Sequence, residues 1–121
     1  MGMTPRRLIP LAAAAALLAF ASTANAAKPK LVGEVGPGFT IQLKAGSKHV
    51  KTLKPGTYVI KVEDKASIHN FHLFGPGLNK STSVSFVGEK TWTVKLKRGT
   101  YTFQCDPHAS AGMKGTIKVK G

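Results

Sequence analysis

Apolar and polar residues alternate in short runs along most of this chain after residue 26. The clearest alternation lies at 39–43 and at 90–96, and similar apolar-rich runs occur at 31–35, 58–62, 68–74, 83–87, 101–104 and 116–119. A period of two predicts half-buried strands, and the triplets Gly36-Pro37-Gly38 and Gly75-Pro76-Gly77 are typical turns. No run after residue 26 has a sustained helical period. The pattern therefore predicts an all-β protein, an antiparallel Greek-key β-sandwich of seven to eight strands.

The first 26 residues have a different pattern. Arg6 and Arg7 precede an apolar run at 8–20, and the small residues Ala24-Asn25-Ala26 follow it. This order is typical of a secretory signal peptide at 1–26 with cleavage after Ala26, which leaves one domain at 27–121. An uncleaved anchor is the alternative, and the paired arginines are also compatible with twin-arginine export. The prediction is an exported protein, periplasmic or extracellular, with no stable membrane insertion after cleavage.

The segment 27–121 is strongly basic. Without Arg6 and Arg7, the 18 basic residues of the chain become 16, which against 5 acidic residues gives a net charge of +11. The lysines are spread out without a run, and an exported protein rarely meets nucleic acid, so a nucleic-acid partner is a poor fit. Because net charge steers association, a negatively charged partner or an anionic cell surface fits better.

Cysteine usage points to a metal. The chain has a single cysteine, Cys105, which cannot form an internal disulfide bond and must be buried, paired between chains or bonded to a metal. His108 and Met113 follow it within nine residues, between the predicted strands 101–104 and 116–119. Thiolate and thioether sulfur favour Cu(I), imidazole suits either oxidation state, and a Cys/His set with a weak axial Met is the blue-copper arrangement.

That arrangement needs a second histidine. His69 and His72 are the candidates, and a regular strand at 68–74 would place them on opposite faces. His69 is preferred because it lies nearer the start of the strand, and His72 then becomes a hydrogen-bonded or partly exposed strand residue. Asn70 would be free to hydrogen-bond the backbone near Cys105 and so fix the ligand geometry. His49, flanked by lysines, is predicted to be a surface residue.

The segments Gly99 to His108 and Gly112-Met113-Lys114-Gly115 together resemble the copper loop of the plastocyanin/pseudoazurin branch of the cupredoxins. The family spacing is Cys, two residues, His, four residues, Met, and His69-Asn70 resembles its upstream His-Asn pair. The resemblance implies one type 1 copper ion with His69, Cys105 and His108 as close ligands and Met113 as a weak axial ligand. It also implies that the electron leaves through the loop histidine, at a mostly apolar end of the molecule.

Three functions are compatible with these features. The preferred one is a blue-copper protein that shuttles single electrons between Cu(I) and Cu(II), and that is not an enzyme. A copper-binding protein for scavenging, delivery or resistance would use the same ligands without regular redox cycling. A secreted interaction module with a vestigial site is the third. The preferred function predicts a monomer and a redox partner protein with an acidic docking surface.

Overall fold

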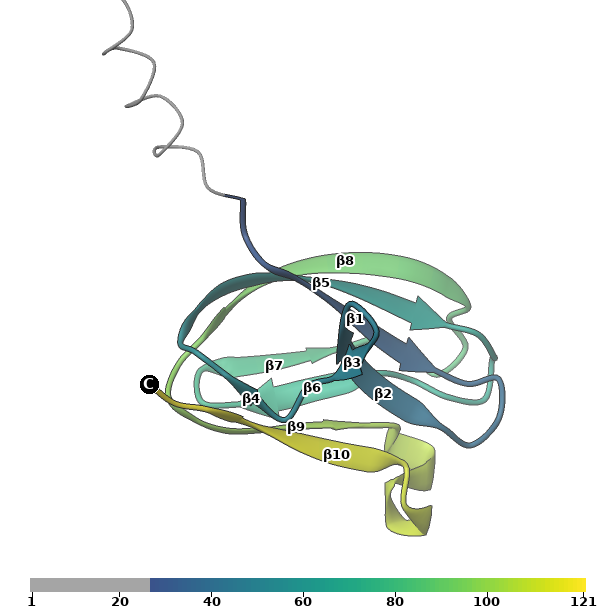
Figure 1. The fold of residues 1–121 in the computed structure, drawn as a ribbon. Helices are drawn as coiled ribbons and strands as arrows, with labels where there is room; N and C mark the ends of the chain where they lie inside the picture. Colours follow the sequence, from purple (N-terminus) through teal and green to yellow (C-terminus); the bar gives the residue numbers. More distant parts are fainter. Residues whose placement is uncertain (1–26) are drawn as a thin grey trace, which may run out of the picture.

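The computed structural model describes residues 27–121, and the predicted signal peptide lies outside these residues. Two five-stranded sheets face each other and enclose one core (Figure 1). The first has the order β3 (Lys48–His49), β2 (Ile41–Ala45), β1 (Lys30–Val35), β5 (Gly56–Asp64), β8 (Gly88–Leu96). The second has the order β4 (Thr52–Leu53), β10 (Lys114–Val119), β9 (Gly99–Gln104), β6 (His72–Gly75), β7 (Leu78–Ser81). A short 3₁₀ helix, η1 (Asp106–Ala111), joins β9 to β10.

The predicted β-sandwich is confirmed. Eight of its ten strands have four or more residues, and β3 and β4 have two residues each. The pairing is not wholly antiparallel, because β1 runs parallel to β5, and β4 runs parallel to β10.

Two of the predicted strands differ from the structure by more than one or two terminal residues. The run 68–74 becomes a strand only at His72, because the preceding residues form a turn in which the His69 N–H donates to the Ala66 carbonyl (3.4 Å). The run 83–87 is no strand, since it carries the chain from one sheet to the other and leaves Val84 and Val87 exposed. Alternation alone does not distinguish a strand from a connection of the same composition.

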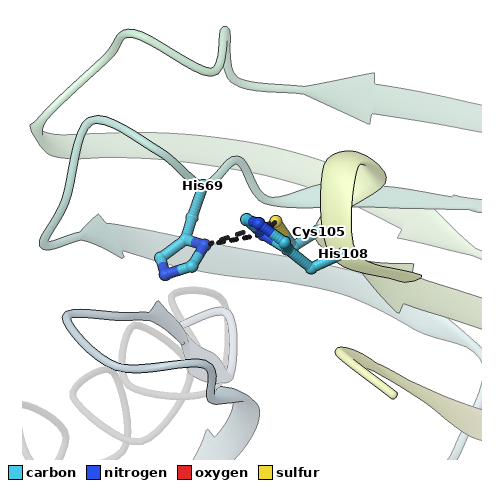
Figure 2. Close-up of side chains that lie close together, drawn as sticks. All are labelled: His69, Cys105 and His108. Atoms are coloured by element: carbon cyan, nitrogen blue, oxygen red, sulfur yellow. Dashed lines mark hydrogen bonds between the residues drawn. The ribbon is translucent and has the colours of Figure 1, made fainter. Parts of the chain in front are cut away.

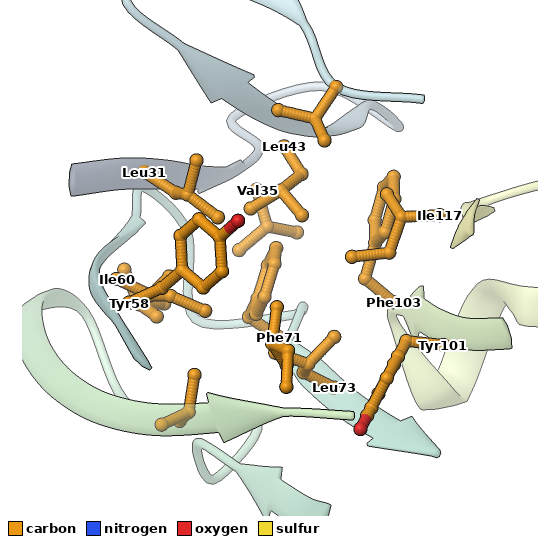
Figure 3. Packing of buried hydrophobic residues seen from close by; sticks show 14 of the residues in the cluster. Leu31, Val35, Leu43, Tyr58, Ile60, Phe71, Leu73, Tyr101, Phe103 and Ile117 are labelled. Atoms are coloured by element: carbon orange, nitrogen blue, oxygen red, sulfur yellow. The ribbon is translucent and has the colours of Figure 1, made fainter. Parts of the chain in front are cut away.

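Apolar side chains from both sheets fill the space between them (Figure 3). On β5 every second residue is buried, as the period of two requires. Phe71 stacks on Phe103 with ring centroids 6.1 Å apart, and a Cβ built at Gly33 would lie 2.6 Å from the Phe71 ring. The absence of a side chain at Gly33 therefore lets β1 approach Phe71, which directly precedes β6.

The connections of the sandwich gather at two opposite ends (Figure 1). One end, here called the loop end, carries the β1–β2, β5–β6 and β7–β8 connections and η1. The other, the turn end, carries the β4–β5 and β8–β9 turns and the end of β10. No helix among residues 27–121 is long and apolar enough to span a membrane.

Candidate metal centre

Three side chains from two connections meet at the loop end (Figure 2). His69 comes from the β5–β6 connection, Cys105 follows the last residue of β9, and His108 lies on η1. The two Nδ1 atoms are 3.2 Å apart, and Cys105 Sγ lies 3.6 Å from Nδ1 of His69 and 3.4 Å from Nδ1 of His108.

The spacing of these three atoms suits a metal ion. They form a nearly equilateral triangle, and the centre of such a triangle lies at the side length divided by √3, or about 2.0 Å, from each corner. Metal–nitrogen and metal–thiolate bonds of about 2.0–2.3 Å are known for zinc, a first-row ion of similar size. An ion close to the plane of the three atoms could therefore bond all three with little movement of the side chains.

The site is closed on nearly every side. His69 and Cys105 are fully buried, Met113 is 2% exposed, and His108 is partly exposed. Nε2 of His69 is buried with no hydrogen-bond partner among the described residues. Since Nδ1 of the same ring lies 3.6 Å from the sulfur, His69 has one nitrogen available to a metal and another that is buried without a hydrogen bond.

Backbone hydrogen bonds hold Met113 beside the cysteine. The Cys105 N–H donates to the Met113 carbonyl (3.0 Å), and the Met113 N–H donates to the His108 carbonyl (3.2 Å). Gly112 ends η1 in the left-handed conformation (φ 104°), which glycine adopts without strain and which turns the chain back toward β10. The sequence correctly predicted this return, although η1 replaces the predicted open loop.

Asn70 clamps the start of the metal loop. Its Oδ1 accepts from the Asp106 N–H (2.7 Å), and its Nδ2 donates to Asp106 Oδ2 (2.9 Å) and to the Thr82 carbonyl (3.3 Å). The predicted hydrogen bond from Asn70 to the backbone near Cys105 is therefore present. Because Asn70 follows His69 directly, this clamp also fixes the position of the His69 backbone relative to Cys105.

His72 lies away from the triangle. Its Nδ1 is 2.9 Å from Asp106 Oδ1 and its Nε2 is 2.6 Å from Asn79 Oδ1, so it is a hydrogen-bonded residue of β6, as predicted. The prediction of one regular strand carrying both histidines is wrong, since His69 precedes β6 and does not share its alternation. His49 is exposed on β3, in agreement with its prediction.

Asp106 is the residue of this network that sequence reasoning missed. Burial by itself raises the pKa of its carboxyl group, but hydrogen bonds from Gln104, Asn70 and His72 together hold the pKa below its usual value. A negative charge therefore lies directly beside Cys105 in the chain. Its partners come from residues up to 36 positions away, and no local signal in the sequence indicates them.

Phe39 is the second missed residue. Its ring stands edge-on to both imidazoles, with centroids 5.4 Å from His69 and 4.9 Å from His108, yet 66% of the residue is exposed. It was predicted to be the first residue of a half-buried strand, but β2 begins at Ile41. Ile68, Val84 and Val87, the other large exposed apolar residues of segment 27–121, also lie on connections at the loop end.

Residues 38–120 match the family described as copper binding proteins, plastocyanin/azurin family. The chain belongs to this family. It is 33% identical to plastocyanin of Dryopteris crassirhizoma over 100 residues, which cover 82% of this chain and 79% of the relative. It is 35% identical to plastocyanin of Nostoc punctiforme over 85 residues, a stretch that covers 58% of this chain and 60% of that relative.

A solved structure of a cupredoxin has the same fold. Rusticyanin from Thiobacillus ferrooxidans superimposes with a TM-score of 0.54 at 27% identity, covering 75% of this chain and 76% of that one. The predicted membership of the cupredoxins is thereby confirmed. The family, together with the His69, Cys105 and His108 cluster and Met113 nearby, supports one type 1 copper ion as the cofactor.

Proposed function

We propose that His69, Cys105 and His108 bind one copper ion, with Met113 as a weak fourth ligand, and that the protein carries single electrons. The observation that carries this proposal is the triangle of two Nδ1 atoms and one Sγ, whose centre is about 2.0 Å from each. The copper supplies the redox couple, and the chain holds a donor set that lies between the preferences of Cu(I) and Cu(II).

The surroundings favour electron transfer over chemistry on a substrate. Two of the three close donors are fully buried, and strands, η1 and the Asn70 clamp fix their positions. A rigid site changes little between oxidation states, and a closed site offers a substrate no coordination position. Family members are electron carriers, and we infer the same role, without enzymatic activity, for this chain.

His108 is the proposed route of the electron. It is the one partly exposed member of the triangle, and Phe39 stands beside it at the surface. Ile68, which directly precedes His69, is also exposed and adds to the apolar surface around Phe39. A redox partner would dock here through an apolar contact, and Lys114, exposed at the start of β10, would meet acidic groups at its rim.

The absorption spectrum of the copper-loaded protein tests the proposal. Thiolate-to-Cu(II) charge transfer should give an intense visible band that disappears in Cys105→Ser. The matched control is His49→Ala, which removes an exposed imidazole and should leave the band unchanged. A band that survives Cys105→Ser would refute the assignment, and a copper site without a reversible potential or measurable self-exchange would favour copper storage or delivery.

We also propose that the protein is exported as a monomer after cleavage behind Ala26. The tripartite pattern of residues 1–26 in the sequence supports the export and the cleavage. N-terminal sequencing of the protein recovered outside the cytoplasm should start at Ala27. A protein that retains Met1 in the membrane fraction would contradict cleavage without affecting the copper assignment.

A further inference from the structure

Five cations collect at the turn end, opposite the metal centre. They come from three separate segments of the chain and are all exposed: Lys54, Lys95, Lys97, Arg98 and Lys120, here called the basic end. Arg98 donates from Nε and Nη2 to the backbone oxygen of Gly121, which brings the end of β10 against the β8–β9 turn. Lys95, Lys97 and Arg98 also line an open hollow of about 420 Å³ together with Pro55 and Gly56.

Acidic side chains do not compensate the charge of the basic end. Among residues 27–121, no acidic side chain forms an ion pair with any of these five residues. Glu34 pairs with Lys44 and Lys65, and Lys61 pairs with both Glu63 and Glu89. The two remaining acids are Asp64, which is buried, and Asp106, which lies in the network at the loop end.

The basic end is also well separated from the apolar surface. The large exposed apolar side chains of the described segment all lie at the loop end. Each of the long strands β5 and β8 has nine residues and runs between the two ends, which corresponds to about 27 Å at the usual rise per residue. The two ends of the sandwich lie on opposite sides of the ribbon (Figure 1). One of them is therefore cationic and the other apolar.

We propose that the basic end binds an anionic lipid bilayer and leaves the copper end facing away from it. A surface that binds another protein usually has an apolar centre surrounded by a polar rim. The basic end instead has charges of one sign on long, flexible side chains, with no large apolar side chain to insert. Such a surface suits a fluid plane of lipid phosphates, to which each lysine contributes separately and in a salt-dependent way.

Vesicle sedimentation tests this proposal with the copper-loaded full chain. The vesicles contain either phosphatidylcholine alone or equal parts of phosphatidylcholine and phosphatidylglycerol. We expect binding to the anionic vesicles at low ionic strength and its loss at high salt. Lys95→Gln/Lys97→Gln should weaken the binding about fivefold per lysine, or about thirtyfold for the pair. Binding to phosphatidylcholine alone measures any contribution from the apolar run of residues 1–26, and this background is subtracted in every arm.

The matched control is Lys48→Gln/Lys80→Gln, which removes the same charge from exposed lysines outside the basic end. It should weaken vesicle binding by about threefold or less, because only the long-range attraction is reduced. Equal losses in the two double variants, or no binding to anionic vesicles, would overturn the proposal. Equally tight binding of soluble polyglutamate through Lys95 and Lys97 would also overturn it in favour of an acidic protein partner. The visible spectrum should be the same in all variants, so this test is independent of the copper assignment.

Discussion

His69 and His72 are three residues apart, yet they lie in different environments. His69 is fully buried against Cys105. His72 lies on β6, where its ring nitrogens contact the side chains of Asp106 and Asn79. His69→Ala should therefore abolish the visible copper band, because one corner of the donor triangle is lost. His72→Ala is the matched control and should keep the band, with copper still bound. Absorption spectra of the two copper-loaded variants decide the question, and the reverse result would make His72 the ligand.

Met113 is expected to set the reduction potential and not copper binding itself. Met113→Leu keeps an apolar side chain of similar volume in a nearly fully buried position but removes the thioether. Because the axial donor stabilises Cu(II), its loss should raise the potential while the visible colour remains. Voltammetry measures the shift. Loss of copper from this variant would mean that Met113 is a stronger ligand than proposed.

Asp106 should make the stability of the protein depend on pH in acid. Hydrogen bonds from three side chains hold its pKa in the folded protein below the unfolded value. Its contribution to the free energy of unfolding is therefore complete above the unfolded pKa, about 3.9, and is lost as the pH falls through the lower folded pKa. Asp106→Asn should be less stable than the wild type at pH 7, and the difference should shrink by about pH 3. Urea unfolding at both pH values measures this, and a constant difference would contradict it.

At the scale of elements, the sequence predicted the sandwich because alternation is a local property. The long strands β5 and β8 and the return through Gly112 to β10 all follow from patterns within a few residues. The parallel pairing of β1 with β5 could not be predicted, since it depends on which distant edges meet. The proximity of Cys105 and His108 could be predicted because their spacing is local, and Met113 stays a predicted ligand. The Asp106 network could not, because it joins residues from three separate connections and strands.

Two phenylalanines that differ in burial should contribute very differently to stability. Phe71 is fully buried and stacked on Phe103. Phe71→Ala should therefore lower the free energy of unfolding by about 3–5 kcal/mol. Phe39→Ala removes the same side chain from a position that is 66% exposed and should change the stability by no more than about 0.5 kcal/mol. Denaturant unfolding of the two variants measures both values. Similar losses would mean that Phe39 contributes to the core.

At the scale of the whole molecule, opposite ends should respond differently in electron self-exchange. Phe39→Glu places a charge at the apolar contact beside His108. Two molecules that meet at this surface must desolvate the new carboxylate, and burying a polar group costs ~1–3 kcal/mol. The variant should therefore exchange electrons about tenfold more slowly or worse. Lys97→Gln changes the net charge by the same amount at the basic end. It should leave the rate unchanged or raise it slightly, because two like-charged molecules then repel each other less. Line broadening in mixtures of the two oxidation states measures the rates, and equal slowing would exclude His108 as the exit.

Among the proposed ligands, His108 reaches the surface while His69, Cys105 and Met113 are enclosed. An electron donor and an electron acceptor would then both dock over His108, and they could not bind there at the same time. If electrons enter and leave through His108, each transfer would require the previous partner to dissociate first, and the dissociation rate of the complexes would limit turnover. Selection would therefore favour brief encounters over tight ones at this face, whatever holds the opposite face in place.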